Sequence, residues 1–302
     1  MTRGGVVVHV PDLPGEHLPR YTKTRGVAAI LRSPGKVAGM QQMGVHVRSV
    51  APGFAGTNRH FHTVEEEWAY VLNGRGKLRI GPLTLPVGPG HFAGFPPGPR
   101  PHHFVNDGAE DLVFLEGGES RAAEDGCWYP DARVMSYGRQ LVEPYQEPPP
   151  EQGTQAQLQD IESLPVQEFS HDVEPRARRQ MRVLHRPTGL TRQAVYWCRV
   201  AQGELTTALH THDRTDEWVF VLDGKGVVRI GNDEFPVGPH DFVGHPAGGE
   251  PHVMQAETDL TYLMGGMIDP LDVVTYPEHG LRRLGGKLEP LSSGSTAHDR
   301  DR

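Results

Sequence analysis

Short apolar stretches, separated by turn-forming residues, run along the whole chain. Six of them are rich in β-branched or aromatic residues: Trp68–Leu72, Lys77–Ile80, Val113–Leu115, Trp218–Leu222, Val227–Ile230 and Tyr262–Met264. The dipeptides that bound several of these stretches favour hairpin turns: Asn73-Gly74, Asp223-Gly224 and Gly231-Asn232. Helical periodicity is weak throughout. Short strands at intervals of roughly ten residues predict an all-β sandwich or barrel.

This pattern occurs twice at a constant spacing. The segment HFHTVEEEWAYVLNGRGKLRIG begins at His60, and the segment HTHDRTDEWVFVLDGKGVVRIG begins at His210, an offset of 150 residues (210 − 60). The offset continues without a gap as far as His102, which corresponds to His252. A repeat of this length predicts two tandem domains with the same fold.

The length and local composition of the chain suggest where these domains divide. A chain of 302 residues is long enough for two domains of about 150 residues each. The sequence predicts an N-terminal domain at 1–142, a Pro- and Gln-rich linker at 143–164, a C-terminal domain at 165–290 and a disordered tail at 291–302. Thirty-seven glycines and 27 prolines agree with many tight turns.

The net charge bears on the class of binding partner, and the cysteine content bears on the cellular compartment. The net charge of −8 argues against a nucleic acid, because phosphate neutralisation needs a basic surface. The two cysteines form no CxxC pair, which favours a reducing compartment. The first apolar run, Val6–Val8, is too short for a signal sequence or a membrane span. We therefore expect a cytoplasmic protein whose partner is a small molecule, with no membrane and no nucleic acid involved.

The repeated histidines have the spacing of metal ligands. Side chains at i and i+2 of a strand point to one face, so His60 and His62 project together, as do His210 and His212. Three imidazoles and one carboxylate suit Fe, Mn, Ni or Zn better than Ca or Mg, and four ligands leave two octahedral positions open for chemistry. The sequence predicts up to two divalent metal ions per chain, iron being favoured. The predicted ligands are His60, His62, Glu67 and His102 in the first copy and His210, His212, Glu217 and His252 in the second.

His103 and His245 lie close in sequence to the predicted ligands. His103 adjoins His102, but the repeat selects His102 as the ligand, because His103 corresponds to Val253. His245 corresponds to Phe95 and is either a turn residue or an acid–base histidine near the second site. Isolated histidines elsewhere are assigned no function, since a lone histidine on a strand is usually a hydrogen-bonded polar residue.

The two motifs resemble those of the cupins. The first motif is HxH, four residues, Glu, six residues and Gly; it is His60-Phe-His62, Glu67 and Gly74, and recurs as His210-Thr-His212, Glu217 and Gly224. The second motif matches Gly90, Pro96, Gly98, His102 and Asn106, whereas His240 and Ala256 replace its Gly and Asn in the second copy. The resemblance covers residues 45–120 and 195–270 and implies two tandem double-stranded β-helix (jelly-roll) barrels.

The family resemblance leaves the reaction open, because one fold supports many activities. We expect a metal-dependent enzyme, first of all a non-haem Fe(II) dioxygenase or related oxidoreductase acting on a small anionic organic substrate. Glu67, Glu217 and His245 are the candidate catalytic residues. One alternative is an isomerase, decarboxylase or lyase that uses Mn, Ni or Zn, and another is a non-enzymatic metabolite-binding protein. The edge strands of such barrels also allow a homodimer.

Overall fold

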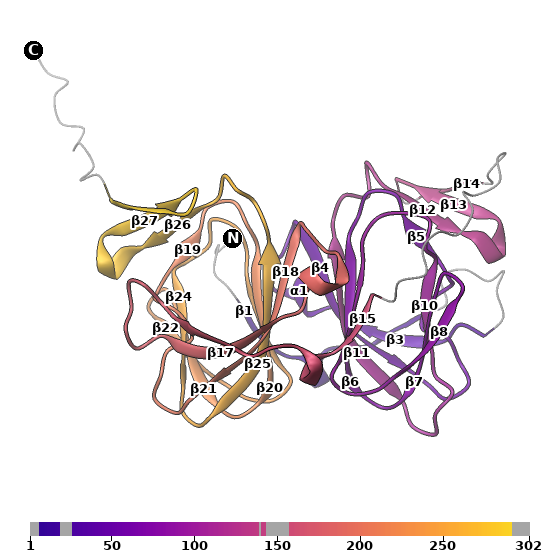
Figure 1. Cartoon of the computed structure of the whole chain (residues 1–302), viewed down its shortest axis with the longest axis horizontal. Helices are drawn as coiled ribbons and strands as arrows, with labels where there is room; N and C mark the ends of the chain where they lie inside the picture. The colour runs from indigo at the N-terminus through magenta and orange to yellow at the C-terminus, as the bar shows by residue number, and fades with distance from the viewer. Residues whose placement is uncertain (1–5, 19–25, 139, 143–156, 292–302) are drawn as a thin grey trace, which may run out of the picture.

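Two β-barrels stand side by side in the computed structural model of the chain, which describes residues 6–18, 26–138, 140–142 and 157–291 (Figure 1). Each barrel is built from a seven-stranded, a three-stranded and a four-stranded sheet. The two sets of sheets repeat the same strand order, which confirms the prediction of an all-β fold present twice. Within the described residues, no helix has the length and apolar character needed to cross a membrane.

The described residues of the N-terminal barrel form fourteen strands. Its large sheet has the order β15 (Leu158–Asp160), β9 (His91–Phe95), β6 (Glu67–Asn73), β11 (Leu112–Glu119), β4 (Met43–Val50), β3 (Ala29–Arg32) and β2 (Glu16–Leu18). The three-stranded sheet is β10 (His102–Val105), β7 (Gly76–Ile80) and β8 (Leu83–Val87). The four-stranded sheet is β14 (Gln140–Val142), β13 (Val134–Tyr137), β12 (Gly126–Tyr129) and β5 (Phe61–His62).

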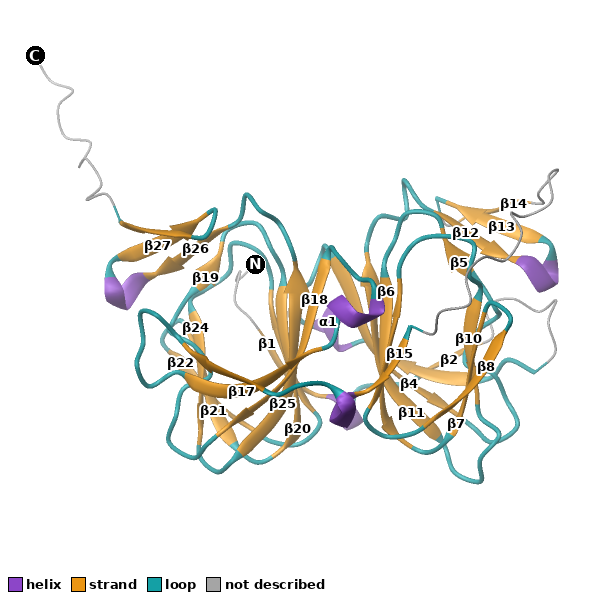
Figure 2. Ribbon diagram, in the orientation of Figure 1, coloured by secondary structure: helices purple, strands orange, loops and turns teal. Residues whose placement is uncertain are grey.

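The C-terminal barrel repeats this arrangement. Its large sheet has the order β1 (Val6–His9), β23 (Asp241–His245), β20 (Glu217–Asp223), β25 (Leu260–Met267), β18 (Gln193–Val200), β17 (Arg178–Val183) and β16 (Gln167–Ser170). The small sheets are β22 (Asp233–Val237), β21 (Gly226–Ile230) and β24 (His252–Ala256), and β19 (Thr211–His212), β26 (Val273–Tyr276), β27 (Leu281–Leu284) and β28 (Lys287–Pro290). Helices are short turns between strands (Figure 2), and the α-helix α1 spans only Pro34–Val37.

The two halves of the chain exchange one edge strand. β1 pairs with β23 of the C-terminal barrel, while β15 pairs with β9 of the N-terminal barrel. Each exchanged strand leads into a 3-10 turn whose first residue, Val10 or Ile161, is buried. The exchange crosses the linker predicted at 143–164, and β15 lies within that linker. Residues 143–156 of the predicted linker and 292–302 of the predicted tail lie outside the described residues.

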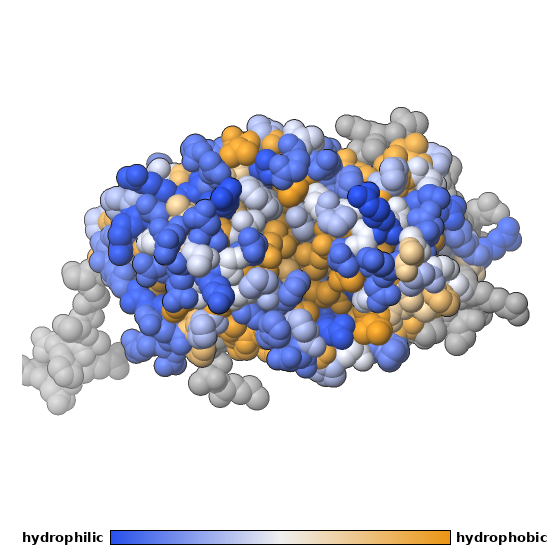
Figure 3. All heavy atoms as spheres, turned by 90° about the horizontal axis from the view of Figure 1, so that it is seen from below, coloured by the Kyte–Doolittle hydropathy of each residue, from blue (hydrophilic) through white to orange (hydrophobic). Residues whose placement is uncertain are grey.

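The barrels pack through one continuous core. The rings of Trp68 and Trp218 stack with their centroids 5.0 Å apart and an interplanar angle of 14°. Both belong to an apolar cluster that draws residues from both barrels, including Leu115 and Leu263. Figure 3 shows apolar side chains gathered in the middle of the molecule, where the barrels meet. The relative position of the two barrels is therefore fixed by buried side chains as well as by strand exchange.

Buried carboxylates at this interface are satisfied by the opposite barrel. Glu66, 1% exposed, accepts backbone hydrogen bonds from Thr191, Arg192 and Gln193. Its counterpart Asp216 accepts backbone hydrogen bonds from residues 41 and 42. Because a buried charge needs several hydrogen bonds to offset its lost hydration, these contacts specify how the barrels meet.

The predicted turns are partly correct. Gly231-Asn232 joins the paired strands β21 and β22, as a hairpin turn should. Asn73-Gly74 instead carries the chain from β6 to β7, which lie in different sheets, so that hairpin prediction is wrong, as it is for Asp223-Gly224. Gly74 has a φ of +79°, and a Cβ there would lie 2.2 Å from the carbonyl oxygen of Asp111. The glycine is required by the left-handed backbone and the close approach, rather than by a hairpin.

Candidate metal centres

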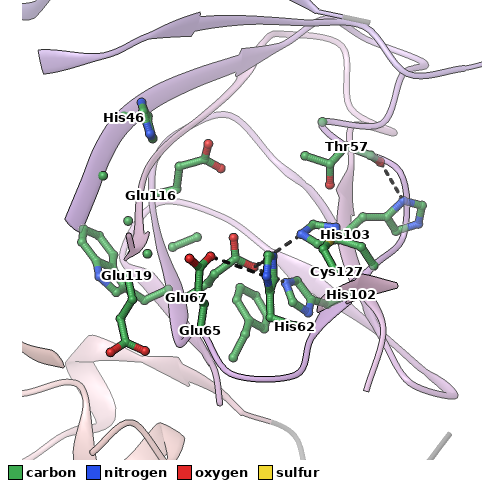
Figure 4. A pocket seen from close by; sticks show the side chains of 18 of the residues that line it. His46, Thr57, His62, Glu65, Glu67, His102, His103, Glu116, Glu119 and Cys127 are labelled. Carbon is green, nitrogen blue, oxygen red and sulfur yellow. Dashed lines mark hydrogen bonds and ion pairs between the residues drawn. The ribbon is translucent and has the colours of Figure 1, made fainter. Parts of the chain in front are cut away.

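Four predicted ligands of the N-terminal barrel converge on one point. His62 is the last residue of β5, and His60 directly precedes that strand. Glu67 is the first residue of β6 and His102 the first of β10. His102 also forms an antiparallel bridge with His60. The Nε2 atoms of His60, His62 and His102 lie 3.4, 3.4 and 3.2 Å from Oε2 of Glu67. Figure 4 shows Glu67, His62 and His102 facing one another inside the barrel.

The C-terminal barrel repeats this geometry with its own four residues. The Nε2 atoms of His210, His212 and His252 lie 3.1, 3.6 and 3.0 Å from Oε2 of Glu217. His210 and His252 form the equivalent antiparallel bridge. The structure therefore brings together each of the two predicted ligand sets.

These distances fit a bound metal ion. Donor atoms about 2.1 Å from a metal and at right angles to each other lie roughly 3 Å apart, close to the separations in both barrels. Three imidazole nitrogens and one carboxylate oxygen form a donor set for a borderline divalent transition metal. The residues present thus fit one ion in each barrel.

The other nitrogen of each histidine fixes the ring. In the N-terminal barrel, Nδ1 of His62 lies 2.6 Å from Oδ2 of Asp125, and Nδ1 of His60 lies 2.8 Å from the carbonyl oxygen of Asn58. A proton on Nδ1 leaves the lone pair on Nε2, which is the atom that faces Glu67. The same partners recur in the second barrel, where Nδ1 of His212 lies 2.5 Å from Oδ2 of Asp272.

Asp125 and Asp272 are functional candidates that sequence reasoning missed. They correspond to each other at an offset of 147 (272 − 125), whereas the histidines correspond at 150. The second copy is therefore three residues shorter between the two positions, so a gapless comparison does not align the aspartates. The shared tyrosine-proline pair that follows, Tyr129-Pro130 and Tyr276-Pro277, is the signal that could have restored the alignment.

Burial and the facing charges set the protonation of each site. Burial opposes ionisation of Glu67 and Glu217, but the facing histidines outweigh it and hold the pKa of both carboxyls well below the usual range. Burial lowers the pKa of His102 and of His252 to about 4, so both rings are neutral near pH 7.

Three histidines of the two sites have raised pKa values in the metal-free protein. Burial acts to lower the pKa of His60, but Cys127 and Glu67 outweigh it and raise that pKa. Burial acts to lower the pKa of His62, but Glu67 and Asp125 outweigh it and raise the pKa well above its usual value. The pKa of His212 is raised in the same way against burial, mainly by Asp272 and Glu217. A raised pKa favours the protonated imidazole, so a metal ion has to compete with protons at each site.

The structure shows where the side chains of His103 and His245 lie relative to the predicted ligands. His102 joins the ligand set, as the repeat predicted, while Nδ1 of His103 lies 3.2 Å from the carbonyl oxygen of Thr57. His245 is buried and stacks on the ring of His252, with centroids 3.4 Å apart and an interplanar angle of 5°. Phe95 stacks on His102 at 3.7 Å in the first barrel. This position therefore supports a ligand ring in both barrels, and a catalytic role for His245 stays a prediction.

The cavity of the N-terminal barrel is large and polar. It has a volume of about 400 Å³ and is lined by the ligand set and by Glu65, Arg48 and Glu116. Burial raises the pKa of Glu65 to about 7. Cys127, directly opposite His62 in the strand pair β5–β12, also lines the cavity, and Val274 takes its place opposite His212 in the second barrel.

The cavity of the C-terminal barrel is smaller and mainly apolar. Its volume is about 200 Å³. The lining beyond the ligand set is dominated by Val219, Val228, Val243, Val253, Met254, Met264 and Val274, with Phe169, Tyr262, Tyr276 and Arg179 among the other residues. Divergence between the two copies has therefore changed the cavity walls while keeping the predicted ligands.

A family model described as Cupin domain matches the chain at residues 46–117 and 196–265. These two segments contain both copies of the HxH motif and both distant histidines. None of the curated proteins compared with the sequence matches it.

Solved structures with two barrels resemble the whole chain. A protein described as glyoxylate-induced, from Pseudomonas aeruginosa, is 16% identical, with 88% of this chain and 90% of that chain covered and a TM-score of 0.62. Oxalate decarboxylase from Bacillus subtilis is 16% identical, with 86% and 75% covered and a TM-score of 0.56. The protein Ylba from E. coli is 13% identical, with 89% and 92% covered and a TM-score of 0.58. At these identities the likeness concerns the fold.

Proposed function

The chain belongs to the cupin superfamily, with two cupin domains in tandem, and on that premise we propose that it is a metal-dependent enzyme acting on a small organic anion. The observation that carries the proposal is the convergence, in each barrel, of three histidine Nε2 atoms on one glutamate oxygen. Each site also opens onto a cavity, so that a small molecule has room beside the ligands.

The proposed ligands would hold the ion through His60, His62, Glu67 and His102, and through His210, His212, Glu217 and His252. A divalent metal bound there would supply a Lewis-acidic centre with open positions for substrate. Neutral histidines and one carboxylate leave such a centre with one net positive charge, which favours an anionic substrate. Asp125 and Asp272 keep two of the rings oriented, and the buried walls exclude water.

Among the reactions open to this site, an iron-dependent dioxygenase reaction is our first proposal. It is supported by the donor set, which suits Fe(II), and by the apolar wall of the C-terminal cavity, which admits O₂ and keeps water out. Glu67 and Glu217 are the candidate bases for a substrate proton.

The second candidate is a decarboxylase, lyase or isomerase reaction with Mn, Ni or Zn. It is supported by the resemblance of the two-barrel fold to oxalate decarboxylase over 86% of this chain. A non-enzymatic metabolite-binding protein is the third candidate, and absence of turnover in the metal-loaded protein would favour it.

Metal analysis followed by gas measurements separates these candidates. Protein purified without chelators is analysed for metals, loaded anaerobically with Fe(II) or Mn(II), and supplied with small carboxylic acids, including oxalate. Uptake of O₂ by the iron form supports dioxygenation, and release of CO₂ without O₂ uptake supports decarboxylation. A preparation that binds no stoichiometric metal contradicts the proposed function.

A further inference from the structure

Each cavity is lined by one arginine, but the two arginines have different partners. Arg48, in the N-terminal cavity, donates to both carboxylate oxygens of Glu116, the shortest contact being 2.6 Å, and to the carbonyl oxygen of Gly56 at 2.9 Å. Its charge is therefore balanced inside the protein, and its donors are already in use.

Arg179, in the C-terminal cavity, has no such acidic partner among the described residues. Its guanidinium carbon lies 4.2 Å from the centre of the Phe169 ring, and Nη1 donates to the carbonyl oxygen of Thr206. Nε is buried and has no hydrogen-bond partner in the part of the chain that the structure describes. The stacking and the one hydrogen bond hold the guanidinium in place while leaving part of it available.

Arg179 is not the repeat of Arg48. The strand registers pair Ala29 with Val50 and Gln180 with Arg199, so Arg179 occupies the position of Ala29. Cys198 occupies the position of Arg48 at the offset of 150. In the second copy the arginine that lines the cavity therefore lies on β17, and not on β18, which is the strand that corresponds to β4. Met264 occupies the register position of Glu116, so the second copy lacks an equivalent carboxylate there.

A second polar atom of the C-terminal cavity also lacks a partner. Nδ1 of His245 is buried without a hydrogen-bond partner among the described residues, and this side chain lines the same cavity as Arg179. Buried polar groups are nearly always hydrogen-bonded in native proteins. Nε of Arg179 and Nδ1 of His245 are therefore two atoms around one cavity that a ligand could complete.

The charged side chains that line the two cavities also favour an anionic ligand in the C-terminal cavity. The N-terminal cavity is lined by one guanidinium and five acidic side chains: Glu65, Glu67, Glu116, Glu119 and Asp125. The pKa of Glu65 is raised to about 7, and Glu119 forms an ion pair with Arg192 of the other barrel, so about three of these negative charges are unaffected by either. The C-terminal cavity is lined by one guanidinium and a single carboxylate, that of Glu217. With a divalent ion in each, only the C-terminal cavity carries an excess of positive charge.

We infer that the C-terminal cavity is the subsite for the anionic substrate, and that Arg179 binds the carboxylate of that substrate. The inference rests on the proposed function, which supplies the metal that the substrate's other end would meet. A volume of about 200 Å³ is below the roughly 300–1,000 Å³ of sites for drug-sized ligands. The ligand class is therefore a small mono- or dicarboxylate.

Direct binding measurements test this assignment. Oxalate and acetate are titrated calorimetrically into metal-loaded and metal-free protein, for the wild type, Arg179→Met, Arg179→Lys and the control Arg178→Met. Arg178 is the exposed neighbour on the same strand and carries the same charge. Loss of a charge-assisted hydrogen bond predicts binding at least about tenfold weaker in Arg179→Met, an intermediate loss in Arg179→Lys, and no change in Arg178→Met, with metal content equal in all four.

The outcomes separate this inference from the proposed function. Unchanged binding in Arg179→Met, binding that is lost in His60→Ala/His62→Ala instead, or no binding of either anion by the metal-loaded wild type at millimolar concentration would each overturn the inference, even if metal is bound. Protein that takes up no metal but still binds acetate in an Arg179-dependent way supports the inference and contradicts the proposed function.

Discussion

Asp125 accepts a hydrogen bond from His62, with 2.6 Å between Oδ2 and Nδ1. The other oxygen of Asp125 accepts backbone hydrogen bonds from Thr63 and Val64. One carboxylate therefore fixes both the histidine ring and the loop that follows it. In this position it decides which nitrogen of His62 faces Glu67 and would face a bound metal.

We predict that Asp125→Asn weakens metal binding in the N-terminal barrel by about 10- to 100-fold. The amide oxygen can keep the loop contacts, but the amide NH₂ then meets Nδ1 of His62 and favours the wrong tautomer. Competition with a chromophoric chelator measures the affinity. Asp107→Asn, which removes an exposed partner of Lys77, is the control. Equal affinities in the two variants would contradict the orienting role of Asp125.

Metal stoichiometry should report two independent sites. We expect wild-type protein to bind about two equivalents, and His60→Ala/His62→Ala and His210→Ala/His212→Ala to bind about one each, because each pair supplies half of one donor set. Plasma mass spectrometry of protein with verified β-sheet circular dichroism measures this. Loss of both equivalents in a single folded variant would show that the sites depend on each other.

Metal affinity should rise with pH through the neutral range. The pKa of His62 is raised well above its usual value in the metal-free protein, and those of His60 and His212 are raised, so a metal ion competes with protons at each site. The bound proton disfavours the metal below the raised pKa, and this effect disappears above it. His102 and His252, with pKa values of about 4, add nothing until pH falls near 4.

Calorimetry in buffers of different ionisation enthalpy checks this directly. We expect metal binding to release protons near pH 7 and to release fewer at higher pH. Proton release that grows with pH would show that His62 and His212 are not protonated in the metal-free protein near neutral pH.

Gln193 links the barrels through two buried hydrogen bonds. Its side chain donates to the carbonyl oxygen of Glu66 at 2.7 Å and accepts from Nε1 of Trp68 at 3.0 Å. Gln193→Met would leave both partners buried and unpaired, at about 1–3 kcal/mol each. We expect the free energy of unfolding to fall by about 2 kcal/mol or more in a urea titration. Gln255→Met, at an exposed hydrogen bond, should change it by less than about 0.5 kcal/mol.

The fold, and the convergence of both candidate ligand sets, follow from the sequence because the two copies align without gaps there. Identical spacing of His60, His62, Glu67 and His102 in a second place is specific, and the pleat of a strand converts that spacing into a shared face. The partners of the ligands were harder to find. Asp125 and Asp272 lie beyond a three-residue difference in length, where the fixed offset no longer applies.

Other features could not be read from a repeat. Arg179 has Ala29 as its counterpart, so comparison of the copies hides it, and only the cavity identifies it. Neither exchanged strand was predicted from the sequence, and β15 lies in the segment that was assigned to the linker at 143–164. Hydrophobic alternation tells which face of β1 or β15 is buried, but an edge strand can complete either of two equivalent sheets.

The strand exchange has a consequence for how the chain matures during synthesis. Val8 in β1, the first strand of the described residues, pairs with Phe242 in β23, 234 residues later (242 − 8). A nascent chain that emerges from its N-terminus must therefore carry an apolar strand without its partner until most of the polypeptide has been made. The first barrel, in turn, receives its last edge only when residues 158–160 have followed. A ribosome stalled at the linker would present two incomplete edges, and fragments split there would complete each other only by reassociating.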